Sequence, residues 1–197
     1  MTARKTEITR ADIIPMEEYG KQRAERRKAL VAVKKNRRVS VGPFATFYFE
    51  NYETMWQQIH EMLYIERGGE EQITDELRAY NPLIPKGSEL VATVMFEIDN
   101  PVQRQNTLAR LGGVEDTMML QFAGHTIKGR PEGDVERTNE QGKTSSVHFM
   151  HFDFTPEQVE AFRRPGAQVI VAFGHANYGH MAVMPDTVRE ELAKDFL

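Results

Sequence analysis

The sequence predicts an α+β fold in which a mainly antiparallel sheet occupies the C-terminal half and N-terminal helices pack on it. In the second half of the chain, short segments rich in β-branched and aromatic residues alternate with turns rich in Gly, Pro or Asn. Most connections between these segments are too short for a βαβ crossover, which favours antiparallel pairing. The first half instead carries apolar residues at helical spacing.

The first elements are predicted from capping and helix-breaking residues. Thr9 and Asp12 resemble a capping box and Pro15 suits a first helical turn, so we expect a helix over residues 15–35. Residues 39–49 are rich in β-forming residues, and the proline among them favours an edge strand.

The segment 51–67 has the period of an amphipathic helix. One stripe is mainly apolar and aromatic and is predicted to be core: Tyr52, Met55, Trp56, Ile59, Leu63 and Glu66. The second stripe includes His60, and we expect its Glu53, Gln57 and Glu61 to face solvent.

The remaining elements follow from the same criteria. Helices are expected over residues 70–80, 102–111, 156–162 and 185–196, and strands over residues 90–98, 117–122, 126–130, 144–154, 169–175 and 180–184. We expect a single domain with a basic helical segment over 1–38, a strand and helices over 39–87, and the sheet with short helices over 88–197.

Composition excludes several kinds of site. The chain has 197 residues, 40% of them hydrophobic, which is enough for one sizeable core. It has no cysteine, so disulfides, thiolate metal sites, iron–sulfur clusters and thiol nucleophiles are excluded. The longest apolar run, residues 169–173, is too short to span a membrane, and the N-terminus has no apolar signal region. We therefore expect a soluble, cytoplasmic protein without a membrane partner.

Charge is distributed unevenly along the chain. Residues 1–38 carry 12 Lys or Arg and 5 Asp or Glu, whereas the whole chain has a net charge of −4. The cations concentrate between Lys21 and Arg38, where Glu25 is the only acidic residue. A basic helix can follow nucleic-acid phosphates, but the acidic remainder of the chain favours a different partner. We expect this helix to lie along an acidic protein surface, either of its own chain, of a second copy in a homo-oligomer, or of another protein.

Motifs of established chemistry are absent from the sequence. Gly142-Lys143-Thr144 resembles the end of a phosphate-binding P-loop, but Arg137 stands where that motif requires its first glycine. The segment also precedes a predicted strand rather than a helix, so we interpret it as part of a hairpin turn. No dinucleotide-binding, nucleophile-elbow or zincin pattern occurs.

Histidines supply the candidate metal ligands. A predicted hairpin over residues 168–184 places His175 and His180 at the two ends of a four-residue turn, so that their imidazoles converge. Strand alternation directs His148 toward the same apolar interior. The three imidazoles could hold Zn, Fe or Mn with one coordination position open.

A carboxylate from the helix at 51–67, Glu61 or Glu53, could complete this metal site. The alternative is that each histidine on an apolar face only satisfies a hydrogen bond. His151 and Asp153 form a second, less favoured pair on the opposite face of their strand.

Several segments resemble a bacterial family that is catalogued only as a domain of unknown function. The resemblance covers nearly the whole chain and is carried by these segments: Val41-Gly-Pro-Phe-Ala-Thr-Phe-Tyr-Phe-Glu-Asn51, His60-Glu-Met, Tyr80-Asn-Pro-Leu-Ile-Pro85, Leu111-Gly-Gly-Val114 and Lys143-Thr-Ser-Ser-Val-His148. Members of that family are often encoded near rubrerythrin-like proteins and iron–sulfur oxidoreductase subunits. The resemblance therefore implies an accessory role in redox metabolism, without implying catalytic residues.

Three functions remain open from the sequence. The first is an accessory interaction subunit whose basic helix docks an acidic redox protein. The second is a metal-binding protein or metal-dependent oxidoreductase built on His148, His175, His180 and Glu61. The third, and least favoured, is a nucleic-acid binder that uses the basic helix. The sequence does not decide whether the protein is an enzyme.

Overall fold

The computed structural model describes residues 5–133 and 137–197 and confirms the α+β class. The helices are α1 (Met16–Lys35), α2 (Tyr52–Glu66), α3 (Gly69–Tyr80), α4 (Pro101–Leu108), α5 (Pro156–Arg163) and α6 (Asp186–Leu192). The strands are β1 (Arg38–Val41), β2 (Ala45–Phe49), β3 (Glu89–Phe96), β4 (Met118–Phe122), β5 (His125–Lys128), β6 (Arg130–Pro131), β7 (Val147–Asp153), β8 (Ile170–His175) and β9 (Tyr178–Val183). Short 3-10 turns, at Arg10–Asp12, Asn81–Leu83, Val114–Thr117 and Ala193–Asp195, complete the described elements.

The described strands form two sheets rather than one. The first has the order β1-β2-β3-β7-β6 and the second β5-β4-β8-β9, and the paired strands in both are antiparallel. The expectation that the sheet lies beyond residue 88 is corrected, because β1 and β2 precede that point. Pro43 lies in the turn between these two strands, after Gly42 with its positive φ of 70°, so a hairpin replaces the single edge strand that was expected.

The main core lies between the two sheets. Rings from both sheets meet there, with Phe47 and Phe96 on the first sheet packed against Phe173 on the second. Tyr178 of β9 packs edge-on against Phe96 and Phe173. Burial of these aromatic rings removes a large apolar area from water.

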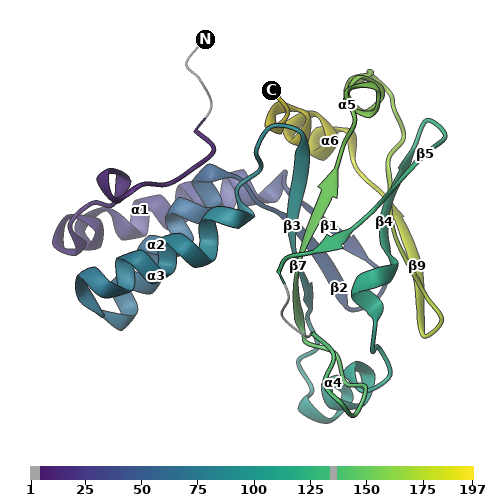
Figure 1. Ribbon diagram of the computed structural model, residues 1–197, viewed down its shortest axis with the longest axis horizontal. Helices are drawn as coiled ribbons and strands as arrows, with labels where there is room; N and C mark the ends of the chain where they lie inside the picture. Colours follow the sequence, from purple (N-terminus) through teal and green to yellow (C-terminus); the bar gives the residue numbers. More distant parts are fainter. Residues whose placement is uncertain (1–4, 134–136) are drawn as a thin grey trace.

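The N-terminal helices cover the other face of the first sheet, as the sequence predicts. Met55, Ile59 and Leu63 of α2 belong to a second core that includes Val91 of β3 and contacts Phe149 of β7. Strand β3 is consequently buried on both faces and is apolar along nearly its whole length. Figure 1 shows the resulting layers, with α1, α2 and α3 beside the first sheet and β4, β5 and β9 on its far side.

Local capping agrees with the sequence at α5 and differs at α1. Thr155 caps α5, as predicted, through a hydrogen bond from the Gln158 amide. The Asn51 side chain accepts the corresponding bond at the start of α2. The Thr9 and Asp12 pair, however, closes the 3-10 turn Arg10–Asp12, and α1 begins later, at Met16. None of the helices within the described residues is both long and apolar enough to cross a membrane.

Candidate functional site

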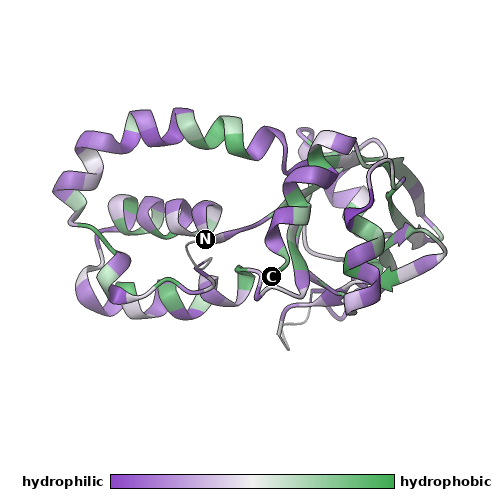
Figure 2. Cartoon of the chain, turned by 90° about the horizontal axis from the view of Figure 1, so that it is seen from above, coloured by the Kyte–Doolittle hydropathy of each residue, from purple (hydrophilic) through white to green (hydrophobic). Residues whose placement is uncertain are grey.

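Helix α1 buries little of its own surface. It has 20 residues, of which only Tyr19 is buried, and most of its length is coloured hydrophilic in Figure 2. An isolated helix of this length is at best marginally stable in water, so its contacts with α2 must hold it in place.

The attachment of α1 centres on Glu61 of α2. Tyr19 donates a hydrogen bond from its hydroxyl to Glu61 Oε1 (2.6 Å), and Gln57 donates from Nε2 to the same hydroxyl. Arg23 forms a bidentate pair with Glu61 at 2.9 and 2.8 Å. The Arg23 guanidinium lowers the pKa of Glu61, whereas burial, followed by the Glu61 carboxylate, raises the pKa of Tyr19.

The second stripe of α2 is therefore largely covered, which corrects the expectation that it faces solvent. Gln57 and His60 are buried beneath α1 and the segment before it, and only Glu53 is exposed among the residues predicted to face water. His60 donates from Nδ1 to the Trp56 carbonyl (2.7 Å) and accepts at Nε2 from the Ile14 amide (3.2 Å). Burial lowers the pKa of His60 to about 4, so this imidazole is neutral near pH 7.

Several cations at and beyond the C-terminal half of α1 form no ion pair with the residues that the structure describes. Within residues 5–133 and 137–197, the following side chains near this end of the helix form no ion pair: Arg27, Lys28, Lys34, Lys35 and Arg38. Beside them lies a groove of about 400 Å³ between α1 and α2, to which Leu30 and Val31 contribute apolar surface. Val31 is 70% exposed, so this apolar surface lacks a partner within the described chain.

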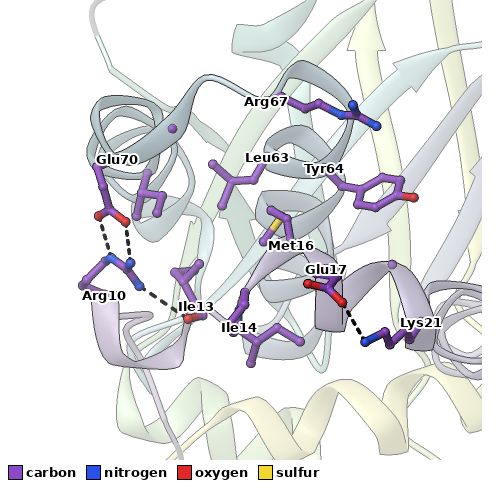
Figure 3. A pocket seen from close by; sticks show the side chains of 14 residues that line it. Arg10, Ile13, Ile14, Met16, Glu17, Lys21, Leu63, Tyr64, Arg67 and Glu70 are labelled. Carbon is purple, nitrogen blue, oxygen red and sulfur yellow. Dashed lines mark hydrogen bonds and ion pairs between the residues drawn. The ribbon is translucent and has the colours of Figure 1, made fainter.

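A larger hollow of about 890 Å³ lies at the other end of α1, between that helix, α2 and α3. Figure 3 shows the side chains around it, which include Ile13, Met16 and Leu63. The charges at its rim are mostly paired, with Arg10 on Glu70 (2.6 Å) and Lys21 on Glu17 (2.9 Å): both pairs are drawn in Figure 3. This hollow offers apolar area but little unbalanced charge, so the charge pattern does not define a ligand.

The hairpin predicted to bring His175 and His180 together has a different register. Strand β8 pairs His175 with Tyr178 and Phe173 with His180, so the turn contains two residues instead of four. The two histidines share a face of the sheet but do not oppose each other. His180 is exposed and lies edge-on against Tyr178, with 4.6 Å between the ring centroids.

The other predicted ligands make hydrogen bonds of their own. His175 donates from Nε2 to the Gly112 carbonyl (3.1 Å) and accepts at Nδ1 from the Asn177 amide (3.1 Å). His148 is buried and donates from Nε2 to the Ser145 carbonyl (2.9 Å). Glu61 lies in the helical layer, bound to Arg23. The part of the chain that the structure describes contains no group of three or more His, Asp or Glu placed to hold a metal ion. The metal site stays a prediction.

Sequence reasoning named His151 but paired it with Asp153, and it missed the buried cluster that His151 forms with two glutamates. His151 Nδ1 lies 2.7 Å from Glu89 Oε2, and its Nε2 bonds the Glu132 carboxylate, whereas Asp153 pairs instead with Arg130. Burial opposes the charged imidazole, but the hydrogen bonds and charges of the two glutamates outweigh it and raise the pKa of His151. The cluster depends on how β3, β7 and β6 pair, because their register places Glu89 and Glu132 near His151. Only a correct prediction of that register would have found it from the sequence.

Comparison with known proteins places the chain in a family without assigning it an activity. A search of curated proteins found no match. A crystal structure from Burkholderia pseudomallei K96243, described as a novel protein of unknown function, is 36% identical, with a TM-score of 0.89 over 96% of this chain and 99% of that one. The family model described as protein of unknown function (DUF3501) matches residues 7–196. The chain belongs to this DUF3501 family.

Proposed function

We propose that the protein is an accessory interaction subunit that docks an acidic segment of a partner protein along the C-terminal half of α1. The observation that carries this proposal is a set of cations beside the groove that Leu30 and Val31 line. These cations form no ion pair with the described residues: Arg27, Lys28, Lys34, Lys35 and Arg38. A helix with one buried residue contributes little to the core, so its length and charge are better explained by a surface role.

The groove determines the chemistry of the partner. Carboxylates would pair with the cations, and apolar side chains of the same segment would cover Leu30 and Val31. Glu61, which also lines the groove, is neutralised by Arg23 and does not cancel the attraction. An acidic amphipathic segment fits both features, and opposite charge would speed its association. That the partner is a redox protein is part of the proposal and rests on the family resemblance alone.

A charge-matched pair of variants tests the docking proposal. The groove variant, Arg27→Glu/Lys34→Glu/Lys35→Glu, reverses the charge at and beside the groove. The control variant, Arg110→Glu/Lys128→Glu/Arg164→Glu, applies the same change of charge to cations elsewhere. Partners captured from the source cells would be identified by mass spectrometry, produced separately and titrated by calorimetry. We expect the groove variant to lose at least about tenfold in affinity, corresponding to about 1.4 kcal/mol, and the control to lose much less.

Equal losses in both variants would contradict a docking surface on α1. A nucleic-acid role makes a different prediction, because phosphate contacts would produce binding to random duplex DNA that weakens steeply with salt. We expect no appreciable DNA binding at an ionic strength of about 0.15 M, because the described body beyond α1 is acidic. DNA binding at that salt that is lost only in the groove variant would favour the nucleic-acid function instead.

The metal-binding alternative is supported by one buried position. Nδ1 of His148 and Oε2 of Glu115 are both buried without a hydrogen-bond partner in the described chain. Burial lowers the pKa of His148 and the Glu115 charge opposes this shift, so the two groups interact electrostatically. The alternative predicts that protein purified without a tag retains near-stoichiometric Fe, Mn or Zn and that His148→Gln loses it. Retention of the metal by that variant would place any site elsewhere.

A further inference from the structure

A hollow of about 500 Å³ lies beside the C-terminal half of α4, where the chain enters β7. Its walls come from α4 and from the segment 137–146 that leads into β7. Figure 1 shows α4 at the lower end of the molecule, well separated from α1. This location makes the hollow independent of the proposed docking surface.

Three cations contribute to the walls of this hollow. They are Arg104 on α4 and Arg137 and Lys143 on the loop, and none of them forms an ion pair within residues 5–133 and 137–197. Arg137 is held with its guanidinium 5.1 Å from the centre of the Phe149 ring, and Arg104 donates from Nη1 to the Ile98 carbonyl (3.0 Å). Both contacts orient a guanidinium without neutralising it.

The remaining lining is polar and uncharged. Apart from Leu108, the other lining residues are hydroxyl or amide residues: Thr138, Asn139, Thr144, Ser145 and Ser146. No carboxylate is among the described residues that line the hollow. Ser145 Oγ accepts from the Val147 amide (3.1 Å), which leaves its hydrogen available to a ligand. The nearby Glu115 is engaged through Oε1 by the Thr138 hydroxyl (3.3 Å).

We propose that this hollow binds the phosphate of a phosphorylated small molecule. Three cations without an ion pair among the described residues outweigh the charge of a phosphomonoester, which is about −2 near pH 7, and guanidinium and hydroxyl donors suit its oxygens. The volume lies within the range of small-molecule sites, about 300 to 1,000 Å³, so there is room for the group that carries the phosphate. The Gly142-Lys143-Thr144 segment would thus contribute Lys143 to a phosphate site built from side chains, without the helix N-terminus of a P-loop.

Calorimetry with inorganic phosphate, AMP and adenosine at an ionic strength of about 0.15 M tests this inference. We expect phosphate and AMP to bind and adenosine not to bind. Arg104→Gln/Lys143→Gln should weaken AMP binding by about tenfold or more, and Arg110→Gln/Lys128→Gln, which removes two cations outside the hollow, should leave it nearly unchanged. Arg104→Gln removes the part-buried hydrogen bond to the Ile98 carbonyl, so circular dichroism would verify that both variants fold before their affinities are compared.

Three results would overturn the proposal. These are adenosine binding as tightly as AMP, equal AMP affinity in the two variants, and no binding of either phosphate compound up to about 10 mM, the weak end of small-ligand affinities. Binding of a single-stranded RNA oligonucleotide without binding of AMP or inorganic phosphate would also refute it and would indicate a nucleic-acid surface instead.

Discussion

Tyr178 of the second sheet donates a hydrogen bond from its hydroxyl to the carbonyl of Val41 in the first sheet, at 2.8 Å. The same oxygen accepts from the amides of Phe44 and Ala45 at 3.0 and 2.9 Å. One phenol therefore satisfies three backbone groups of the β1–β2 turn and fixes that turn against β9. The main core lies directly behind this connection.

We expect Tyr178→Phe to destabilise the protein by about 3 kcal/mol, because each buried polar group left without a partner costs about 1 to 3 kcal/mol. The free energy of unfolding in urea measures the effect. Tyr48→Phe is the matched control, since it removes a hydroxyl whose bond to Glu97 (2.8 Å) is exposed to solvent. Similar losses in the two variants would show that the three backbone groups find other partners.

The approach of Tyr178 and His180 to Gly42 gives a second prediction. Gly42 has a φ of +70°, and a Cβ there would lie 2.6 Å from His180 Cγ and 2.8 Å from the Tyr178 hydroxyl. Gly42→Ala should therefore add a steric cost to the cost of a left-handed alanine, which is about 1 to 2 kcal/mol. Gly124→Ala isolates the second cost, because Gly124 has a φ of +80° and no atom within 4 Å of the added carbon. We expect the Gly42 variant to unfold at a clearly lower urea concentration than the Gly124 variant. Equal unfolding midpoints in the two variants would contradict the close packing around Gly42.

The His151 cluster predicts a specific dependence of stability on pH. The folded-state pKa of His151 is raised above its usual value of 6.5, so the contribution of the cluster is complete below about pH 6.5 and is lost as the pH rises through the folded-state pKa. Above that pH, Glu89 and Glu132 lose the positive charge between them. Unfolding measured from pH 6 to 9 should show a decline in stability for the wild type that is much smaller in His151→Gln.

His180→Gln is the control for this pH dependence, because His180 is exposed and lies outside the cluster. The His180 variant should show the same decline in stability with rising pH as the wild type. If His151→Gln declines with pH as steeply as the wild type, the proton that is lost belongs to another group.

The sequence was sufficient to predict those elements whose own residues show a clear apolar period or a local cap. Strand β3 and helix α2 follow their apolar periods, and the Thr155 cap is local. Which face of a helix is buried, and how two strands pair, depended on other elements of the fold. The buried side of α2 at Gln57 and His60 is created by α1, which shows little apolar periodicity of its own, and the β8–β9 register is a property of the pairing of Phe173 with His180.

The attachment of α1 through Glu61 gives the last prediction. Removing the negative charge in Glu61→Gln breaks its bidentate pair with Arg23 and weakens the acceptor of the Tyr19 hydroxyl. Since α1 has only one buried residue, we expect it to open locally, with hydrogen exchange over residues 16–35 faster by about tenfold, or about 1.4 kcal/mol. Mass spectrometry of deuterated peptides would measure this exchange.

Exchange in β3 and α3 should remain unchanged in the Glu61 variant, because their contacts are made within other parts of the core. Glu17→Gln, on α1 itself, is the matched control: the pair of Glu17 with Lys21 is exposed, and exposed pairs of this spacing contribute only about 0.3 to 0.5 kcal/mol. Faster exchange throughout the protein would indicate global destabilisation instead of release of α1. Unchanged exchange over residues 16–35 would mean that Trp56, beneath the guanidinium of Arg26 at 4.5 Å, holds the helix without Glu61.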